Sequence, residues 1–421
     1  MPHGPSLIFD KSSLESLNLD EAVLLDNFYR STITPLFFVE CLADLEKNIS
    51  SASTPEQLVG SLADRTPESQ SMPNVHHLRI LKGELTAVLR MEKVHGRPMI
   101  DYGQRVQLGG QKGVVFKRSQ EYEALQRWTE RQFLEVERNI AKQWRRSLAQ
   151  INFEQMVKTV MGPLGHWRKP KSLADAKLIA DNVIDNLDPE WLLRFGLTLL
   201  GVPEAVDWTI NDWIAHRRPP LRDRYPYFVL MLTINIFFCL VLPTQLLSKV
   251  KQSHSVDLAY LYYLPFCSVF TSKDNFHAQV VPLFLQPEQT FVNGNELKED
   301  LKQLVTYYSS LPDEVLRSGL IHFAAYPPDD TAFLVTRLWD KYLPDWRRIK
   351  AEPRPPMSPE EEKQMVEHIN ELSEATETHD EKDFDLLDYA LIERRLSARK
   401  GRWLRFSEEQ IARMNEKNNK S

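Results

Sequence analysis

Leu7-Ile8-Phe9-Asp10 is the stretch from which we predict the fold. Three apolar residues in succession indicate a buried strand, and this strand ends at an acidic residue. Much later in the chain, Val269-Phe270-Thr271-Ser272 repeats the pattern and runs through Lys273 into Asp274. We therefore expect two strands, each with an aspartate at its carboxyl end.

Two further acids are expected on helices. Thr34 is a favourable N-cap and Pro35 a favourable first helical residue, so Glu40 should lie in the second turn of a helix. Ser255 is placed to cap another helix, which holds Asp257 near its start. The sequence thus contains four acids at the ends of strands or on helices close to them.

These four acids can converge if the two strands are parallel neighbours in one sheet. Ligand sites of open α/β sheets form at the carboxyl ends of the strands. Clustered carboxylates repel one another unless a divalent cation neutralises them, and such hard oxygen ligands suit Mg²⁺ or Mn²⁺ better than zinc. One or two ions of this kind can convert water into a nucleophile that attacks phosphorus. We therefore expect a metal site formed by Asp10, Glu40, Asp257 and Asp274.

The motifs around these acids resemble the ordered acidic motifs of PIN domains. The resemblance is carried by residues 7–13, 34–40, 257–260 and 269–274. Members of that family are typically Mg²⁺- or Mn²⁺-dependent ribonucleases, and many act as toxins or in RNA processing. The resemblance implies an α/β fold with a PIN-like central parallel sheet flanked by helices. It also implies that Asp10, Glu40, Asp257 and Asp274 are catalytic, metal-binding acids and that Ser272 is the site hydroxyl preceding the last acid.

The gap between Glu40 and Asp257 is longer than a compact PIN domain needs. We therefore predict four parts of the chain. Residues 1–48 form the first part of the PIN-like domain, and residues 245–290 form the second. Residues 49–244 form a mainly helical insertion whose last helix packs on the sheet, and residues 291–421 form a helical C-terminal extension.

Several elements follow from local patterns. Residues 105–116 resemble a hairpin around a glycine-rich turn, and residues 119–148 carry the apolar spacing of one long amphipathic helix. The apolar run at 227–242 is shorter than the ~20 residues of a bilayer span and indicates a buried helix. Residues 280–285 are predicted to form another apolar strand.

A nucleic-acid substrate would have to be held by a local basic patch, because the formal net charge is -6. Basic clusters interleaved with an aromatic residue are typical of phosphate contacts combined with base stacking, although solvated helix faces give the same pattern. The candidate contacts to RNA are Arg217, Arg218, Arg222, Arg224, Trp167 and Lys169.

Other residue types give weaker signals. The three cysteines lie in apolar surroundings and form no Cys-x-x-Cys pair, and no secretory leader is visible, so we expect a reducing, cytoplasmic location. No histidine group has metal-ligand spacing. His254 and His277 flank the acid motifs, and either could contact a substrate phosphate.

The leading hypothesis is a cytoplasmic endoribonuclease, of toxin or defence type, in which Mg²⁺ or Mn²⁺ activates the attacking water. Two alternatives remain open: a catalytically inactive PIN-like scaffold for protein partners, and a nuclease acting on DNA. A regulatory or inhibitory protein partner is a further expectation, and no membrane association is expected.

Overall fold

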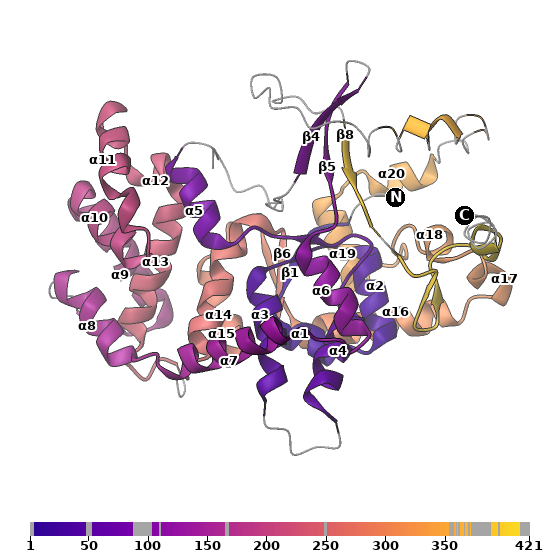
Figure 1. The fold of residues 1–421 in the computed structure, drawn as a ribbon, viewed down its shortest axis with the longest axis horizontal. Helices are drawn as coiled ribbons and strands as arrows, with labels where there is room; N and C mark the ends of the chain where they lie inside the picture. Colours follow the sequence, from indigo (N-terminus) through magenta and orange to yellow (C-terminus); the bar gives the residue numbers. More distant parts are fainter. Residues whose placement is uncertain are drawn as a thin grey trace.

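A five-stranded parallel sheet lies at the centre of the molecule (Figure 1). The computed structural model describes residues 4–47, 53–86, 103–108, 111–164, 168–247 and 251–352, and beyond them 358, 360, 363–365, 367–368, 371, 389–394 and 396–412. The strand order is β3-β2-β1-β6-β7, and every neighbouring pair is parallel. The strands are β1 (Ser6–Phe9), β2 (Arg30–Ile33), β3 (Met72–Pro73), β6 (Val269–Ser272) and β7 (Thr290–Asn293).

The two strands predicted to carry acids are direct neighbours. Leu7 of β1 is in register with Ser31 of β2 on one side and with Val269 of β6 on the other. The prediction of a parallel sheet flanked by helices is therefore confirmed. Two strands of the sheet lie outside the ranges predicted for the PIN-like parts: β3 falls within residues 49–244, and most of β7 lies beyond residue 290.

Side chains of β1 alternate between two hydrophobic cores, as the period of two in a strand requires. Leu7 and Phe9 belong to one core and Ile8 to the other. The first core contains α2 (Leu19–Phe28), α3 (Pro35–Ala43), α16 (Gly294–Ser309) and α19 (Leu334–Tyr342). The second contains the helical region at the left of Figure 1.

The remaining described elements flank these cores. Close to the sheet lie α1 (Lys11–Ser16), η1 (Asp44–Glu46), α4 (Pro55–Arg65), α14 (His254–Tyr260), η3 (Leu261–Phe266), α15 (Asn275–Val280) and η4 (Val281–Leu283). Between α4 and α14 come α5 (His77–Leu85), α6 (Gln120–Thr129), α7 (Glu135–Ala149), α8 (Phe153–Leu164), α9 (Leu173–Asn186), α10 (Pro189–Leu199), η2 (Pro203–Ala205), α11 (Val206–Ala215), α12 (Leu221–Arg224) and α13 (Pro226–Val241). After β7 follow α17 (Asp313–Leu316), α18 (Leu320–Phe323) and α20 (Trp346–Ala351).

The buried helix predicted at 227–242 is confirmed as α13. Its first free N–H groups are not capped by its own side chains. Instead the carboxylate of Glu84 on α5 accepts hydrogen bonds from the backbone N–H groups of Tyr227 and Phe228, both at 2.8 Å. Within the described part of the chain, no helix has the length and apolar character that crossing a bilayer requires.

The prediction of a single long helix at 119–148 is wrong. The structure has two helices there, α6 and α7, because Arg131, just after the end of α6, adopts a φ of 59°, which is outside the right-handed helical region. The side chain of Glu137 then accepts the N–H of Leu134 at 2.7 Å and starts the second helix. The apolar spacing continues across the break, but only its first part is buried: Leu125 and Trp128 of α6 lie in the core, whereas Val136 and Ile140 of α7 are exposed.

The strand predicted at 280–285 is also wrong. Val280 ends α15, and the 3₁₀ turn η4 follows. A short apolar run cannot by itself distinguish a buried strand from a buried helix. Pro282 at the start of η4 lacks the N–H that a central strand would use.

The described end of the chain is not only helical, which corrects the predicted helical C-terminal extension. β8 (Tyr389–Ile392) pairs in parallel with β5 (Gln111–Phe116), which pairs antiparallel with β4 (Gly103–Leu108) as the predicted hairpin. β9 (Arg399–Lys400) and β10 (Trp403–Leu404) form a second small sheet. This segment is ordered by long-range burial, since Trp403 is 3% exposed and packs in the core that contains α2.

Candidate functional site

Asp10 and Asp274 both follow neighbouring strands and both cap helices. Asp10 accepts the backbone N–H of Ser13 at 2.9 Å at the start of α1. Asp274 accepts the N–H of Phe276 at 2.6 Å at the start of α15. Because β1 and β6 are adjacent and parallel, these two caps lie at the same edge of the sheet.

Asp10 accepts more hydrogen bonds from described residues than the other three acids do. Its Oδ2 accepts hydrogen bonds from the hydroxyls of Ser12 and Ser272, each at 2.7 Å, and its side chain is buried. Burial acts to raise the pKa of Asp10, but the hydrogen bond and charge of His277, with the two hydroxyls, outweigh it and hold the pKa below its usual value. Asp10 is thus an ionised carboxylate with hydrogen bonds to both of its oxygens.

His277 is a member of this site. Its ring is completely buried, with Nδ1 2.8 Å from the Oγ of Ser272 and Nε2 2.8 Å from the backbone oxygen of Asp257. Nδ1 also lies 3.5 Å from Oδ2 of Asp10. The expectation that His277 could contact a substrate phosphate is not supported, because its ring is enclosed by protein.

The hydrogen-bond pattern implies that both ring nitrogens of His277 carry protons. The single hydroxyl hydrogen of Ser272 is donated to Asp10, so its oxygen accepts from His277 and from the N–H of Asp274. The backbone oxygen of Asp257 can only accept. Burial lowers the pKa of His277, but Asp10 and Asp257 outweigh that effect and raise it to about 9. A buried imidazolium therefore compensates the charge of Asp10.

Glu40 and Asp257 have a different character. The hydroxyl of Tyr260 donates to Oε2 of Glu40, and burial followed by repulsion from Asp257 and Asp10 raises the pKa of Glu40 to about 7. Burial, with repulsion from Asp274 and Asp10, raises the pKa of Asp257 to about 7. These charges act on one another, so the structure places all four predicted acids in one electrostatic neighbourhood.

The carboxylate oxygens of these four acids fit a hard divalent cation in part. The carboxylate of Asp257, Oε1 of Glu40 and Oδ2 of Asp274 have no hydrogen-bond partner among the described residues, whereas both oxygens of Asp10 are occupied. Oxygen ligands of this kind suit Mg²⁺ or Mn²⁺. Within the described ranges, however, no three His, Cys, Asp or Glu side chains are arranged as a ready group of ligands. A cation would therefore have to draw these side chains together.

The predicted substrate contacts lie apart from the acids. In Figure 1, α11 and α12 lie at the left end of the molecule, away from β1 and β6. Arg222 is paired with Asp185 at 2.7 Å, and Arg224 with Asp212 at 2.6 Å, so their charges are already compensated.

The other predicted cationic contacts are not paired with an acid of the described residues. Arg218 stacks over the ring of Trp213 at 5.7 Å, and neither Arg217 nor Lys169 is paired with an acid within the described chain. Arg217 and Arg218 adopt φ values of 65° and 56° at the end of α11. Trp167 lies outside the described residues.

Comparisons with models of protein families, with curated proteins and with solved structures find no match to this chain. The likeness of the acid motifs to PIN domains therefore remains an expectation from the sequence.

Proposed function

We propose that this chain is a metal-dependent endoribonuclease of PIN-like type. The observation that supports this function best is the meeting of acids from distant parts of the sequence at the carboxyl edge of one parallel sheet. Ser272, which is 262 residues from Asp10 in sequence, donates a hydrogen bond to it. Both acids that cap helices at this edge follow adjacent strands, where open α/β sheets form their ligand sites.

In this proposal Asp10, Glu40, Asp257 and Asp274 bind Mg²⁺ or Mn²⁺. The bound ion would supply an activated water and would neutralise the charge that develops on the phosphodiester. Asp10 is held ionised and oriented by Ser272 and His277. Glu40 and Asp257, whose pKa values are about 7, would release protons when the cation binds.

The proposal also includes the location of the enzyme, the access of RNA to the acids and the regulation of cleavage. We infer a cytoplasmic enzyme of toxin or defence type, in which RNA reaches the acids past the helical region and a protein partner restrains cleavage. Arg217, Arg218 and Lys169 are the predicted basic contacts whose charges stay available for phosphate, because no acid in the described chain is paired with them.

A catalytically inactive scaffold is the second candidate function. It is favoured by the hydrogen bonds that occupy both oxygens of Asp10 and by the lack, among the described residues, of a preformed ligand group. In that case the imidazolium of His277 would take the place of a cation beside Asp10.

Asp257→Asn is the variant that tests the nuclease function, because this side chain makes no hydrogen bond to a described residue and the change keeps its shape. We expect roughly 100-fold slower cleavage of a labelled single-stranded RNA with Mn²⁺. Asp207→Asn, at an acid whose side chain is 90% exposed, is the matched control and should cleave normally.

A DNA strand of the same base sequence, assayed in parallel, shows whether the enzyme cleaves RNA or DNA. Wild-type protein that cleaves neither strand at any Mn²⁺ concentration contradicts the nuclease function. If Mn²⁺ also leaves the melting temperature unchanged, the scaffold is supported.

A further inference from the structure

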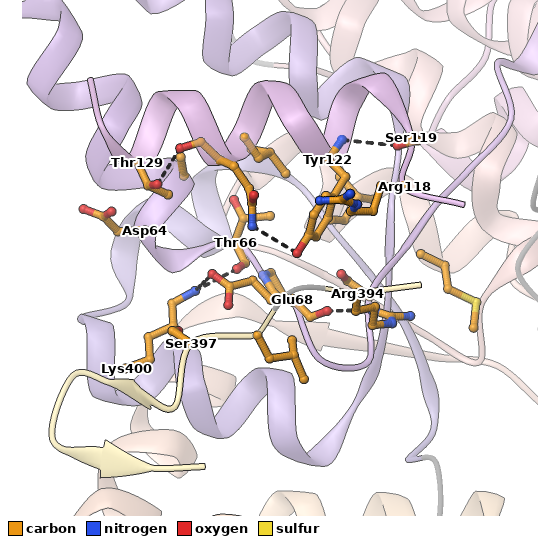
Figure 2. A pocket seen from close by; sticks show the side chains of 18 of the residues that line it. Asp64, Thr66, Glu68, Arg118, Ser119, Tyr122, Thr129, Arg394, Ser397 and Lys400 are labelled. Atoms are coloured by element: carbon orange, nitrogen blue, oxygen red, sulfur yellow. Dashed lines mark hydrogen bonds and ion pairs between the residues drawn. The ribbon is translucent and has the colours of Figure 1, made fainter. Parts of the chain in front are cut away.

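A cavity of 620 Å³ lies between the α4–α6 pair and the C-terminal segment (Figure 2). Tyr122 and Gln126 reach it from α6, and Arg394 and Lys400 reach it from the segment that follows β8. None of the four acids described above lines it. Its volume falls in the range of about 300–1,000 Å³ that is usual for small-molecule sites.

The body of this cavity is apolar. Aliphatic and aromatic side chains come from the central sheet, from α3 and α6 and from the ends of β5 and β8. They include Ile33, Phe38, Met72, Phe116, Leu125 and Ile392. Such a lining favours the hydrocarbon or aromatic part of a ligand.

The acids that line the cavity are already paired. Glu68 contacts Lys400 at 2.7 Å and Arg405 at 3.0 Å. Asp64 contacts Arg131 at 2.7 Å, and Glu393 contacts Arg118 at 3.0 Å. Little negative charge is therefore left to repel an anion.

Arg394 differs from Lys400 and Arg405, the other largely buried cations near the cavity, which are both paired with Glu68. Its Nη1 donates to the backbone oxygen of Glu68 at 2.6 Å, and no acidic side chain in the described chain is paired with its guanidinium. Burial lowers the pKa of Arg394 and outweighs the charges of Asp26 and Tyr122, which act to raise it. A guanidinium has five N–H donors, and this one has a single described acceptor.

We propose that this cavity binds a small organic anion, with a carboxylate or phosphate head group on Arg394 and an apolar body against Phe38, Met72 and Leu125. Arginine pairs with both head groups through two parallel hydrogen bonds, which a neutral group cannot replace. The ligand would supply a directly paired counter-charge, which no acid of the described residues provides. This site is independent of the proposed nuclease function.

Titration calorimetry of the full chain with four probes tests the proposal. Octanoate and octyl phosphate carry the two possible head groups, 1-octanol lacks the charge, and acetate lacks the apolar body. We expect at least one of the two anions to bind, and both acetate and 1-octanol to bind at least about tenfold more weakly. The stronger of octanoate and octyl phosphate identifies the head group.

Two variants place the bound anion. Arg394→Met should weaken its binding by about tenfold or more, while Arg348→Met, at an exposed arginine of α20, should not change it. Ser397→Trp, at an exposed residue of the cavity wall, should weaken binding by occupying the space. Melting curves check that each variant is folded.

The proposal is overturned if neither anion binds to the wild-type chain or if 1-octanol binds as tightly as the anions. It is also overturned if the folded Ser397→Trp and Arg394→Met variants both bind as the wild type does. Should Arg394→Met fail to fold, Ser397→Trp alone decides.

Discussion

The hydroxyl of Ser272 donates a hydrogen bond to Oδ2 of Asp10 at 2.7 Å, and this bond joins the end of β6 to the residue that follows β1. The same oxygen of Ser272 accepts from Nδ1 of His277 and from the N–H of Asp274. One small side chain therefore satisfies three buried polar groups at the edge of the sheet. It also fixes the two helix-capping acids relative to each other.

Ser272→Ala should lower the free energy of unfolding by about 1–3 kcal/mol, because it leaves buried donors without an acceptor and removes a donor from Asp10. Urea unfolding at pH 7 measures the change. Ser255→Ala is the control, since that hydroxyl is bonded only to the backbone oxygen of Gln252 near the surface. It should change stability by no more than about 0.5 kcal/mol. Equal losses in the two variants would show that the Ser272 bonds do not stabilise the site.

The protein without a divalent ion should lose stability as the pH rises. Glu40 and Asp257 have pKa values of about 7 in the folded chain against 4.5 and 3.8 for the unconstrained groups, so the folded state binds more protons between about pH 4 and 7. Stability then falls as pH increases through that window. His277, whose pKa rises from 6.5 to about 9, extends the loss to about pH 9.

Urea unfolding in a chelating buffer at pH 5, 7 and 9 measures this trend. The double variant Glu40→Gln with Asp257→Asn removes two of the groups responsible, so its stability should fall less between pH 5 and 7. A wild-type curve that is flat or rises between pH 5 and 9 is the contrary result.

Mn²⁺ should raise the melting temperature more at pH 8 than at pH 6. At pH 6 the cation has to displace protons from Glu40 and Asp257, whereas at pH 8 both carboxylates are ionised. The matched control is Asp207→Asn, which should behave as the wild type does. An identical shift at both pH values, or a shift that survives in Asp257→Asn, would place the cation elsewhere.

Part of the site could be predicted from local sequence. Asp10 and Asp274 follow short apolar runs, and Thr34 with Pro35 marks the start of the helix that carries Glu40. These signals depend on a few neighbouring residues. The prediction that Ser255 caps the helix carrying Asp257 is wrong by two residues, since the residue that precedes α14 is Ser253.

The rest depends on contacts between distant residues. β3 is only two residues long, includes a proline and is a strand because it pairs with β2. The role of His277 comes from Ser272, Asp10 and the backbone of Asp257, which no local spacing reveals. A buried histidine three residues after Asp274, on the inner face of a helix, is the signal that could have suggested it.

Glu84→Gln should destabilise the protein by about 1–3 kcal/mol, because Glu84 accepts two buried N–H groups at the start of α13 and an amide can accept only one of them well. Burial raises the pKa of Glu84 from 4.5 to about 7, so the wild type loses stability as the pH rises through that window whereas the Gln variant does not titrate there, and the loss caused by the substitution should be smaller at pH 8 than at pH 6. Glu190→Gln, at a surface pair with Arg194 on α10, should cost at most about 1 kcal/mol. The interpretation fails if the two substitutions cost the same at pH 6.

Arg405→Met tests whether the C-terminal segment is part of the core. The guanidinium of Arg405 is 5% exposed and contacts Asp26 on α2 at 3.3 Å and Glu68 at 3.0 Å. Removing it would leave two acids facing each other without that cation, and breaking one side of a buried ion pair typically costs about 3–5 kcal/mol. We expect a loss of that size in urea unfolding, while Arg348→Met on the exposed face of α20 should change stability by at most about 0.5 kcal/mol. If Arg405→Met behaves like Arg348→Met, the segment that follows β8 packs on the domain without stabilising it.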